Sequence, residues 1–323
     1  MRVVLMHYHL RRGGVTSVLL NQAKMLADAG YDILIISGEE TDDVRLAFPH
    51  VVVKELQYDR YRSENVGTRQ EVSALIAENI TKAMNDRWGQ AADIVHVHNP
   101  LIQKNDALIS ALKILQKEGV RFLLQNHDLA EDFRPDVYIS DEDYPENCHY
   151  GVINRRCFSF MRRAGLQAGG LHLLANEVVP VKPEPNLERT RFLYPVRAIR
   201  RKNIGEALLL SLFIPQGTTV TITLPPTTDK DEEIYRNWVS LAEELNLPVE
   251  FEAGLKHSLS ELMGSSIAVL TTSVKEGFGF SYLEPWAAGR AVIGRRIDYV
   301  CRDFEDAGIH FDSLYSSLKI PMV

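Results

Sequence analysis

Short apolar runs alternate with amphipathic stretches along the chain, and this alternation limits the possible folds more than any other feature. Six runs in the first half have strand length and are apolar apart from His96 and His172, as buried parallel strands are: 3–6, 33–36, 51–53, 94–97, 122–124 and 171–174. Helically spaced apolar residues lie between them, in 15–29, 72–84 and 106–117. The alternation predicts a doubly wound α/β domain, which binds ligands at the carboxyl ends of its strands.

The same alternation returns after a proline-rich stretch. Residues 179–188 hold Pro180, Pro183 and Pro185 among several charges, and such a segment forms neither a helix nor a central strand. Strand-like runs then lie at 192–194, 220–224, 249–251, 267–270 and 291–293, with helices expected at 205–212, 232–245, near Ser260 and at 282–288. We therefore expect an α/β protein with two Rossmann-like domains facing each other across a cleft, at 1–179 and 191–323, joined by a linker at 180–190.

Composition excludes several classes of protein. The chain has 323 residues, of which 45% are hydrophobic and 24% charged, as in soluble globular proteins. Its net charge of −7 gives no overall attraction to nucleic acid or an anionic membrane, and no apolar run approaches the roughly 18 residues of a membrane span. The three cysteines lack CxxC spacing, which favours a reducing cytoplasm. The oligomeric state is left open.

Five of the ten histidines lie where predicted strands end, which is the ligand-binding edge of an α/β domain: His7, His9, His96, His98 and His127. The side chains of each His-x-His pair face one way, because a strand alternates with period two. Such pairs occur in metal sites, so a metal-dependent hydrolase is one alternative. No carboxylate ligand follows in order, and we favour hydrogen-bonded strand-end residues without a metal. His127 can act as a neutral donor or acceptor at physiological pH.

Two further segments could bind phosphate. Gly13-Gly14 follows the first strand and precedes a helix, where backbone amides and the helix dipole attract an anion. A turn that merely needs glycine explains this pair equally well. Four cations follow the first strand of the second half, where they could neutralise phosphate charge: Arg197, Arg200, Arg201 and Lys202.

The most specific segment is 275–289, with the sequence KEGFGFSYLEPWAAG. Glu276 lies in a glycine loop after a predicted strand, and Glu284 lies near the first turn of the next helix. The amides that lead into this helix can bind phosphate, while the two carboxylates can accept hydrogen bonds from sugar hydroxyls. These amides belong to Gly277, Phe278, Gly279 and Phe280. A first-turn acid that complements the helix dipole would explain Glu284 alone, so the segment favours a phosphorylated, polyhydroxylated ligand.

With these motifs in this order, the chain resembles the retaining family 4 glycosyltransferases of GT-B fold (glycosyl transferases group 1). The resemblance covers essentially the whole chain, and its most specific element is the E-x7-E pattern of Glu276 and Glu284. The chain departs from the family at Val196 and Asn203, where glycine is usual. It also departs at its end, because the resemblance predicts a further helix after 314–320 that crosses back onto the first domain.

The resemblance implies transfer of a hexose from a nucleoside diphosphate sugar to an acceptor hydroxyl, with retention of configuration and without a cofactor. It implies that Glu284 binds the nucleotide ribose and Glu276 the hydroxyls of the donor sugar. It further implies that the diphosphate lies against Arg197 and Lys202 and against Gly13-Gly14 of the other domain, with His127 beside the transferred hexose. The nucleotide base, the sugar and the acceptor are not determined by these motifs.

Basic residues in loops of the first domain predict a small anionic acceptor, such as a glycerate or a phosphosugar. These acceptor candidates are His7, His9, Arg11, Arg12 and Arg134. Asp141-Glu142-Asp143 forms a DxD, the metal-diphosphate motif of another glycosyltransferase fold, but we interpret its acidic loop as solvated and expect metal independence. A protein that binds nucleotide sugars without turnover is the second alternative, and a sugar-nucleotide epimerase of the same fold is a third.

Overall fold

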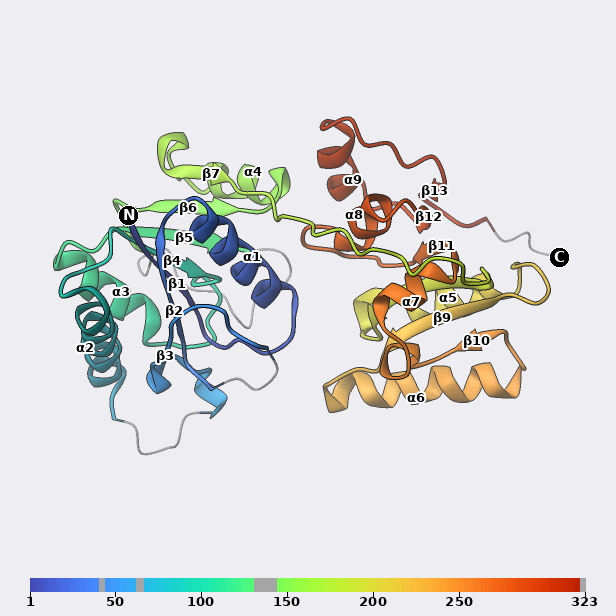
Figure 1. Cartoon of the computed structure of the whole chain (residues 1–323), viewed down its shortest axis with the longest axis horizontal. Helices are drawn as coiled ribbons and strands as arrows, with labels where there is room; N and C mark the ends of the chain where they lie inside the picture. Colours follow the sequence, from blue (N-terminus) through green and yellow to red (C-terminus); the bar gives the residue numbers. More distant parts are fainter. Residues whose placement is uncertain (41–43, 62–66, 131–143, 320–323) are drawn as a thin grey trace. The chain divides into compact units, whose positions relative to one another are not determined.

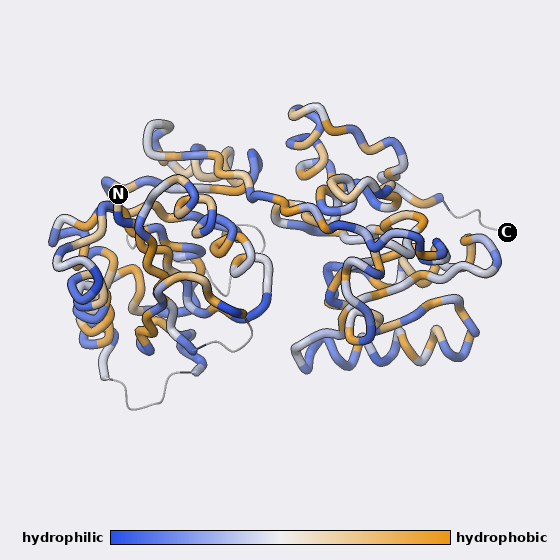
Figure 2. The backbone as a smooth tube through the Cα atoms, in the orientation of Figure 1, coloured by the Kyte–Doolittle hydropathy of each residue, from blue (hydrophilic) through white to orange (hydrophobic). Residues whose placement is uncertain are grey.

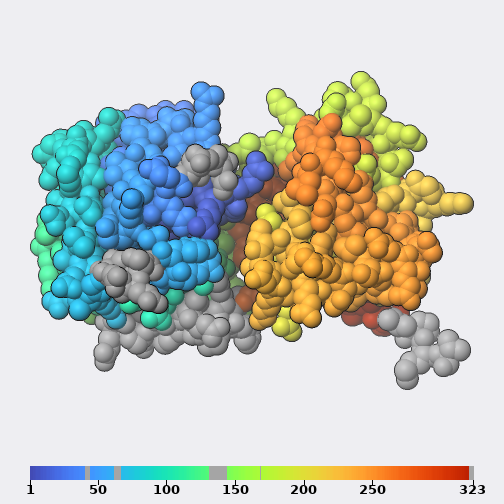
Figure 3. Space-filling model, turned by 90° about the horizontal axis from the view of Figure 1, so that it is seen from below, coloured from blue at the N-terminus to red at the C-terminus, as the bar shows by residue number. Residues whose placement is uncertain are grey.

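The computed structural model describes residues 1–40, 44–61, 67–130 and 144–319. It divides into two compact units, Met1–Glu177 and Val178–Val323, which carry separate ranges of colour in Figures 1 and 3. Each unit contains a parallel sheet with helices against it (Figure 1). Among the described helices, none has the length and hydropathy that a bilayer crossing requires.

The described part of the first unit has a seven-stranded parallel sheet in the order β3-β2-β1-β4-β5-β6-β7. The strands are β1 Arg2–His7, β2 Asp32–Ser37, β3 His50–Val52, β4 Ile94–His98, β5 Phe122–Asn126, β6 His149–Val152 and β7 Leu171–Leu173. The helices are α1 Gly14–Asp28, α2 Arg69–Trp88, α3 Leu108–Lys117 and α4 Arg155–Arg163. The direction of winding reverses between β1 and β4, which makes their carboxyl ends the switch point where ligands bind.

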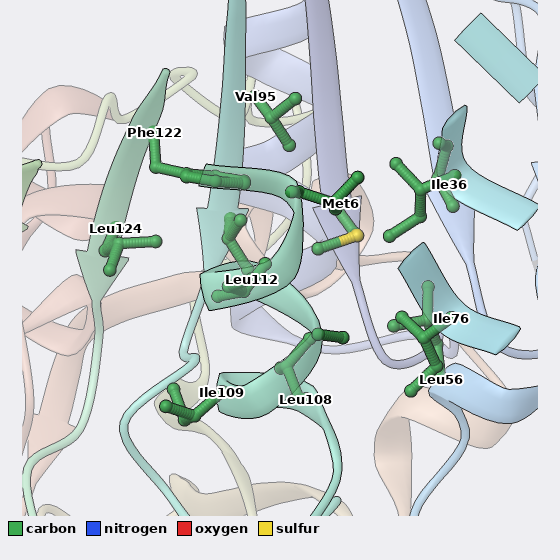
Figure 4. Close-up of a cluster of buried hydrophobic side chains, with 14 of the residues drawn as sticks. Met6, Ile36, Leu56, Ile76, Val95, Leu108, Ile109, Leu112, Phe122 and Leu124 are labelled. Carbon is green, nitrogen blue, oxygen red and sulfur yellow. The ribbon is translucent and has the colours of Figure 1, made fainter. Parts of the chain in front are cut away.

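Alternate residues of each central strand pack on opposite faces of this sheet. Val3 and Leu5 belong to the cluster under α1, whereas Met6 belongs to the larger cluster formed with α2 and α3, where Ile76 and Leu112 pack (Figure 4). The sheet is therefore buried on both faces, which explains why its strands are continuous apolar runs rather than alternating ones.

The described part of the second unit has a six-stranded parallel sheet in the order β10-β9-β8-β11-β12-β13. The strands are β8 Arg191–Arg197, β9 Thr219–Leu224, β10 Val249–Glu250, β11 Ser266–Thr271, β12 Ala291–Arg295 and β13 Leu314–Tyr315. The helices are α5 Ile204–Ser211, α6 Asp229–Glu244, α7 Leu259–Gly264, α8 Phe280–Ala287 and α9 Asp298–Glu305. Its switch point lies between β8 and β11. Helix α6 alternates hydrophobic and hydrophilic bands (Figure 2), as a helix with one buried face does.

Side-chain caps fix where some of these helices begin. Thr68 accepts a hydrogen bond from the backbone of Glu71 and Glu71 accepts one from the backbone of Thr68, so α2 begins with a capping box. Helix α2 ends at Gly89, which adopts φ 66°, in the left-handed region that favours glycine.

The apolar pattern did not predict β6, α4 or α9. In β6, His149 and Gly151 interrupt the apolar run, although the strand pairs with β5 and β7. A Cβ atom on Gly151 would lie 2.5 Å from Leu174 Cδ1, so a side chain at this position would have to displace Leu174. Among the described residues, 174–190 contain neither helix nor strand.

Candidate functional site

The loops after β8 and β11 meet at the switch point of the second sheet. Lys202 Nζ contacts Glu276 Oε1, and Arg201 Nη1 donates to Glu276 Oε2 at 3.1 Å. Lys202 and Glu276 are only 9% and 7% exposed, so this ion pair is largely removed from water. Two residues that the sequence analysis selected in separate motifs therefore lie in direct contact.

The charges of this pair depend on each other. Burial by itself would raise the pKa of the Glu276 carboxyl, but Lys202 and Arg201 outweigh burial and hold that pKa below its usual value. Burial is also the main effect on Glu284, whose pKa it raises against a partial opposing effect of Lys202. The site therefore contains two carboxylates. Glu276 is neutralised by two cations, and the buried Glu284 would be stabilised by a hydroxyl group that donates a hydrogen bond to it.

Buried hydroxyl groups hold the backbone that carries Lys202. Tyr194 Oη donates to the carbonyl oxygen of Lys202 at 2.7 Å and lies 3.0 Å from Ser273 Oγ. Thr272 Oγ1 donates to the same carbonyl at 3.1 Å. Tyr194 and Thr272 were not predicted from the sequence, because there they resemble ordinary residues in and after buried strands. Only the pairing of β8 with β11 brings both hydroxyls to this peptide.

Asn203 stands where the resembling family usually has glycine. Its φ of 51° lies in the left-handed region, which asparagine tolerates better than most other residues with a side chain. Asn203 Nδ2 donates to Glu206 Oε2 at 2.8 Å, which fixes the side chain beside the start of α5. The departure from the family pattern therefore preserves the backbone conformation that glycine would allow.

The glycine loop leads into α8 as the sequence predicted, with Gly279 as its N-cap at φ 102°. A Cβ atom on Gly279 would lie 2.3 Å from Val300 Cγ1, so both conformation and packing require glycine. Phe278 packs edge to face against Phe280 and Phe304, with ring centroids 5.2 and 5.6 Å away. These contacts set the course of the backbone between Glu276 and the helix.

Arg197 has a different contact from the other cations of its segment. Its Nη1 donates to the carbonyl oxygen of Pro225 at 2.9 Å, in the loop between β9 and α6. The side chains of Arg201 and Lys202, in contrast, donate to the loop after β11. The structure thus joins Lys202, Arg201 and Glu276, and leaves Arg197 in a separate contact.

Four imidazoles lie together at the switch point of the first sheet. His7 Nδ1 donates to the carbonyl oxygen of His98 at 3.1 Å, and His98 Nδ1 lies 2.9 Å from His127 Nε2. His96 stacks on His98 with ring centroids 4.5 Å apart. Burial lowers the pKa of His7 to about 3, of His96 to about 4 and of His127 to about 3, and it lowers the pKa of His98 as well. The four rings are therefore neutral at physiological pH.

These imidazoles are held by hydrogen bonds and stacking. Within the described residues, no group of three or more histidine, cysteine or acidic side chains has an arrangement that could hold a metal ion. The metal-dependent hydrolase therefore gains no support from the described part of the chain. Arg134 and the DxD at 141–143 lie outside the described residues.

Basic residues and tyrosines from the segments after β1 and after β3 form a group that we call the basic–aromatic cluster. It consists of His9, Arg11, Tyr58, Arg60 and Tyr61. Arg11 donates to Tyr61 Oη at 3.1 Å, and its charge is balanced by Glu39 at 2.6 Å. The Arg60 guanidinium lies 4.6 Å from the centre of the Tyr61 ring and 5.4 Å from that of Tyr58.

The sequence analysis missed Tyr58, Arg60 and Tyr61, because their segment has no apolar period and no motif. The only signal in the sequence was that aromatic and basic residues occur together in this segment. The tertiary structure brings the segment into contact with Arg11. Arg12, the other arginine expected near the acceptor, is exposed.

The structure bears on one of the two explanations of Gly13-Gly14, the turn that merely needs glycine. Helix α1 begins at Gly14, and Gly13 has an extended backbone with φ 176°, which any residue can adopt. A Cβ atom on Gly14 would meet nothing within 4 Å, and one on Gly13 would meet only Arg11 O at 3.9 Å. The turn itself therefore does not require glycine. Two missing side chains at a helix start leave its amides accessible to a ligand.

No protein-family model matches the sequence. The mannosylglucosyl-3-phosphoglycerate synthase of Petrotoga mobilis is 26% identical over an alignment of 340 positions, which covers 93% of this chain and 66% of the relative. The chain thus spans just under two thirds of the length of that curated relative.

Solved structures of low sequence identity share the fold. Sucrose-phosphate synthase from Thermosynechococcus elongatus matches with a TM-score of 0.65 and 18% identity, over 92% of this chain and 81% of that one. HepE from Anabaena, in complex with UDP and glucose, matches with a TM-score of 0.68 and 14% identity, over 94% of this chain and 82% of that one. Together with the two doubly wound units, these likenesses confirm the GT-B fold.

Proposed function

We propose that this protein is a retaining, metal-independent glycosyltransferase that moves a hexose from a nucleoside diphosphate sugar to an acceptor hydroxyl. The observation that carries this proposal is the buried contact of Lys202 and Arg201 with Glu276, beside the glycine loop that precedes α8. Cations, a carboxylate and helix-start amides at one switch point suit a ligand with both phosphate and hydroxyl groups. The similar HepE structure contains UDP and glucose, which agrees with this ligand class.

The chemistry requires stabilisation of a leaving diphosphate. When the glycosidic bond breaks, negative charge grows on the phosphate oxygens and the sugar becomes oxocarbenium-like. Fixed cations aimed at that charge are the main catalytic effect expected in such a site. We assign this role to Lys202, with Arg201 and Arg197 binding the diphosphate. As the resemblance implies, the leaving phosphate takes the acceptor proton on the same face, which retains the configuration.

Other residues would orient the donor. Glu276 would accept hydrogen bonds from the sugar hydroxyls, and these hydroxyls would replace part of its present contact with the cations. Glu284, whose burial raises its pKa, would gain a partner in the ribose hydroxyls. Gly13-Gly14 would admit the diphosphate to the start of α1, and His127 would lie beside the hexose.

We further propose a small anionic acceptor bound at the basic–aromatic cluster. Arg11 is neutralised by Glu39, whereas Arg60 forms no ion pair among the described residues and lies against two tyrosine rings. A guanidinium held by rings keeps its donors for a carboxylate or phosphate. The curated relative is named for a product that contains phosphoglycerate, which supports an acceptor of this class.

Thermal unfolding with a panel of nucleoside diphosphates and their sugars, with and without EDTA, tests the donor site. A ligand at 100 times its Kd should stabilise the protein by about 2.7 kcal/mol, and we expect one nucleoside diphosphate to do so regardless of EDTA. Destabilisation by EDTA alone, with no nucleotide effect, would support the metal-dependent hydrolase instead.

Product analysis then separates turnover from binding. With 3-phosphoglycerate or its glycosides as acceptors, we expect release of nucleoside diphosphate together with a glycoside whose anomeric configuration, read by proton NMR, equals that of the donor. Binding without nucleotide release would indicate a protein without turnover. Release of a free or isomerised sugar would indicate an epimerase.

A further inference from the structure

His98 lies in the centre of the buried imidazole group and has no role in the function proposed above. Its side chain is 1% exposed. Its Nδ1 lies 2.9 Å from His127 Nε2, and its carbonyl oxygen accepts a hydrogen bond from His7 Nδ1. Its other ring nitrogen, Nε2, is buried and has no hydrogen-bond partner among the described residues.

This unpartnered nitrogen determines which ring of the His98–His127 pair donates. A neutral imidazole carries one proton, so one of the two rings donates across the 2.9 Å contact and the other accepts. If His127 donated, His98 would carry its proton on the buried Nε2, as an N–H without an acceptor. If His98 donates from Nδ1, its Nε2 is only an unused acceptor. Buried N–H groups without partners are the rarer case in proteins, so the second arrangement is favoured.

The tautomer of His127 follows from this choice. We propose that His98 is a positioning residue that donates from Nδ1 to His127 Nε2 and thereby holds His127 with its own proton on Nδ1. Among the described residues no hydrogen bond involves His127 Nδ1. That nitrogen is therefore the one available to a ligand, and it offers an N–H donor. Its ligand atom must be an acceptor, such as a hydroxyl or phosphate oxygen.

Neighbouring contacts fix the ring that carries this donor. The backbone N–H of His127 donates to Asn99 Oδ1 at 2.6 Å, and that of Asp128 donates to the same oxygen at 3.1 Å. The rings of His98 and His127 are 10° from parallel. The protein itself, before any ligand binds, therefore orients His127. This tautomer stands on contacts within the first unit, whereas its use on a hexose rests on the proposed function.

The tautomer can be observed directly in the intact chain. Long-range proton–nitrogen NMR of protein labelled with ¹⁵N-histidine, at pH 7.5, distinguishes a protonated from an unprotonated ring nitrogen, and H127N assigns the signals. We expect His127 to be protonated on Nδ1 and unprotonated on Nε2. Protonation on Nε2 in the wild-type protein would overturn the proposal without any variant.

Two matched variants isolate the effect of His98. H98L removes the ring that contacts His127, and H96L removes a buried ring of the same group that stacks on His98 and whose hydrogen bond among the described residues is to Gln125. We expect a mixture of His127 tautomers in H98L and the single wild-type tautomer in H96L. An unchanged tautomer in a folded H98L protein would show that His98 does not set it.

Activity tests the use of the tautomer separately. In H98L we expect kcat to fall about tenfold, the effect of one neutral hydrogen bond. When His127 is already replaced by leucine, we expect the additional H98L substitution to change kcat little. If His127 is protonated on Nδ1 but its replacement leaves kcat unchanged, the proposed contact of His127 with the hexose is wrong. Absence of glycosyl transfer by the wild-type chain, with the tautomer as expected, would instead overturn the proposed function.

Discussion

Lys202 and Glu276 are 74 residues apart in sequence and form a buried ion pair where strands β8 and β11 end. Removing two charges from water is costly, and their attraction offsets this cost only in good geometry. Arg201 adds a second cation to Glu276 at 3.1 Å, so this carboxylate contacts two positive charges that a phosphate group could also contact. The pair is thus a feature of the free protein that a diphosphate would rearrange.

Replacement of Lys202 by alanine should lower kcat by about 10²- to 10³-fold, because the cation acts on charge that grows in the transition state. KM for the donor should change much less. Steady-state kinetics with the best donor checks this, with the exposed Lys230→Ala as a control. A large rise in KM with kcat unchanged would contradict the assignment.

Gly14→Ala should retain wild-type stability, because the Cβ atom of the new alanine meets nothing in the free protein. The substitution should weaken donor binding, because this Cβ atom would occupy space at the start of α1. Gly279→Ala should unfold more easily, since it combines a φ of 102° with a Cβ atom 2.3 Å from Val300. Thermal unfolding with and without nucleoside diphosphate measures both effects. Equal nucleotide stabilisation of the wild type and Gly14→Ala would argue against a ligand at this helix start.

Tyr194→Phe should destabilise the second unit by about 1–3 kcal/mol, because it removes a buried donor from the Lys202 carbonyl. Urea unfolding measures this change. Tyr31→Phe is the control, since the Tyr31 hydroxyl forms no hydrogen bond among the described residues. We expect kcat of the folded Tyr194→Phe variant to fall, because the hydroxyl holds the backbone of Lys202. An unchanged kcat would mean that the hydroxyl only supports folding.

Arg60→Ala should raise KM for an anionic acceptor about tenfold or more, the effect of losing one charged hydrogen bond, and leave KM for the donor unchanged. Initial rates at varied acceptor concentration and ionic strength test this. The control is Arg121→Ala, an exposed arginine at the amino end of β5. A neutral acceptor used without salt dependence would contradict the proposal.

The buried histidines should make stability depend on pH. Their pKa values in the folded protein, about 3 for His7 and His127 and about 4 for His96, lie below the unfolded value near 6.5. Between pH 6.5 and 4 these histidines therefore bind protons in the unfolded chain but not in the folded protein. Their contribution to the free energy of unfolding is highest above pH 6.5 and falls as the pH is lowered.

Each such histidine contributes a slope of up to about 1.4 kcal/mol per pH unit once its unfolded form is protonated. Urea unfolding between pH 7.5 and 5.5 measures the slope before most carboxylates titrate. His96→Gln should reduce this slope. A slope that does not change in His96→Gln would mean that His96 is protonated in the folded state.

Much of the architecture was readable from the sequence, because a sheet buried on both faces requires continuous apolar strands. The glycine loop at 275–289 was equally visible, since its glycines and carboxylates lie close together in sequence. Strand β6 was not predicted, because His149 and Gly151 interrupt its apolar run, and no local pattern reveals its pairing with β5 and β7. The roles of the motifs came from the resemblance and stay predictions.

Tertiary structure alone decided which residues share a site. Strand order brings Tyr194 and Thr272 to the carbonyl of Lys202, and it brings Arg60 and Tyr61 to Arg11. The sequence by itself determined most of the strands and helices and the glycine loop, since those depend on local composition and period. Contacts between segments depend on sheet topology, which arises from the packing of the whole unit, and for this reason only the structure could decide them.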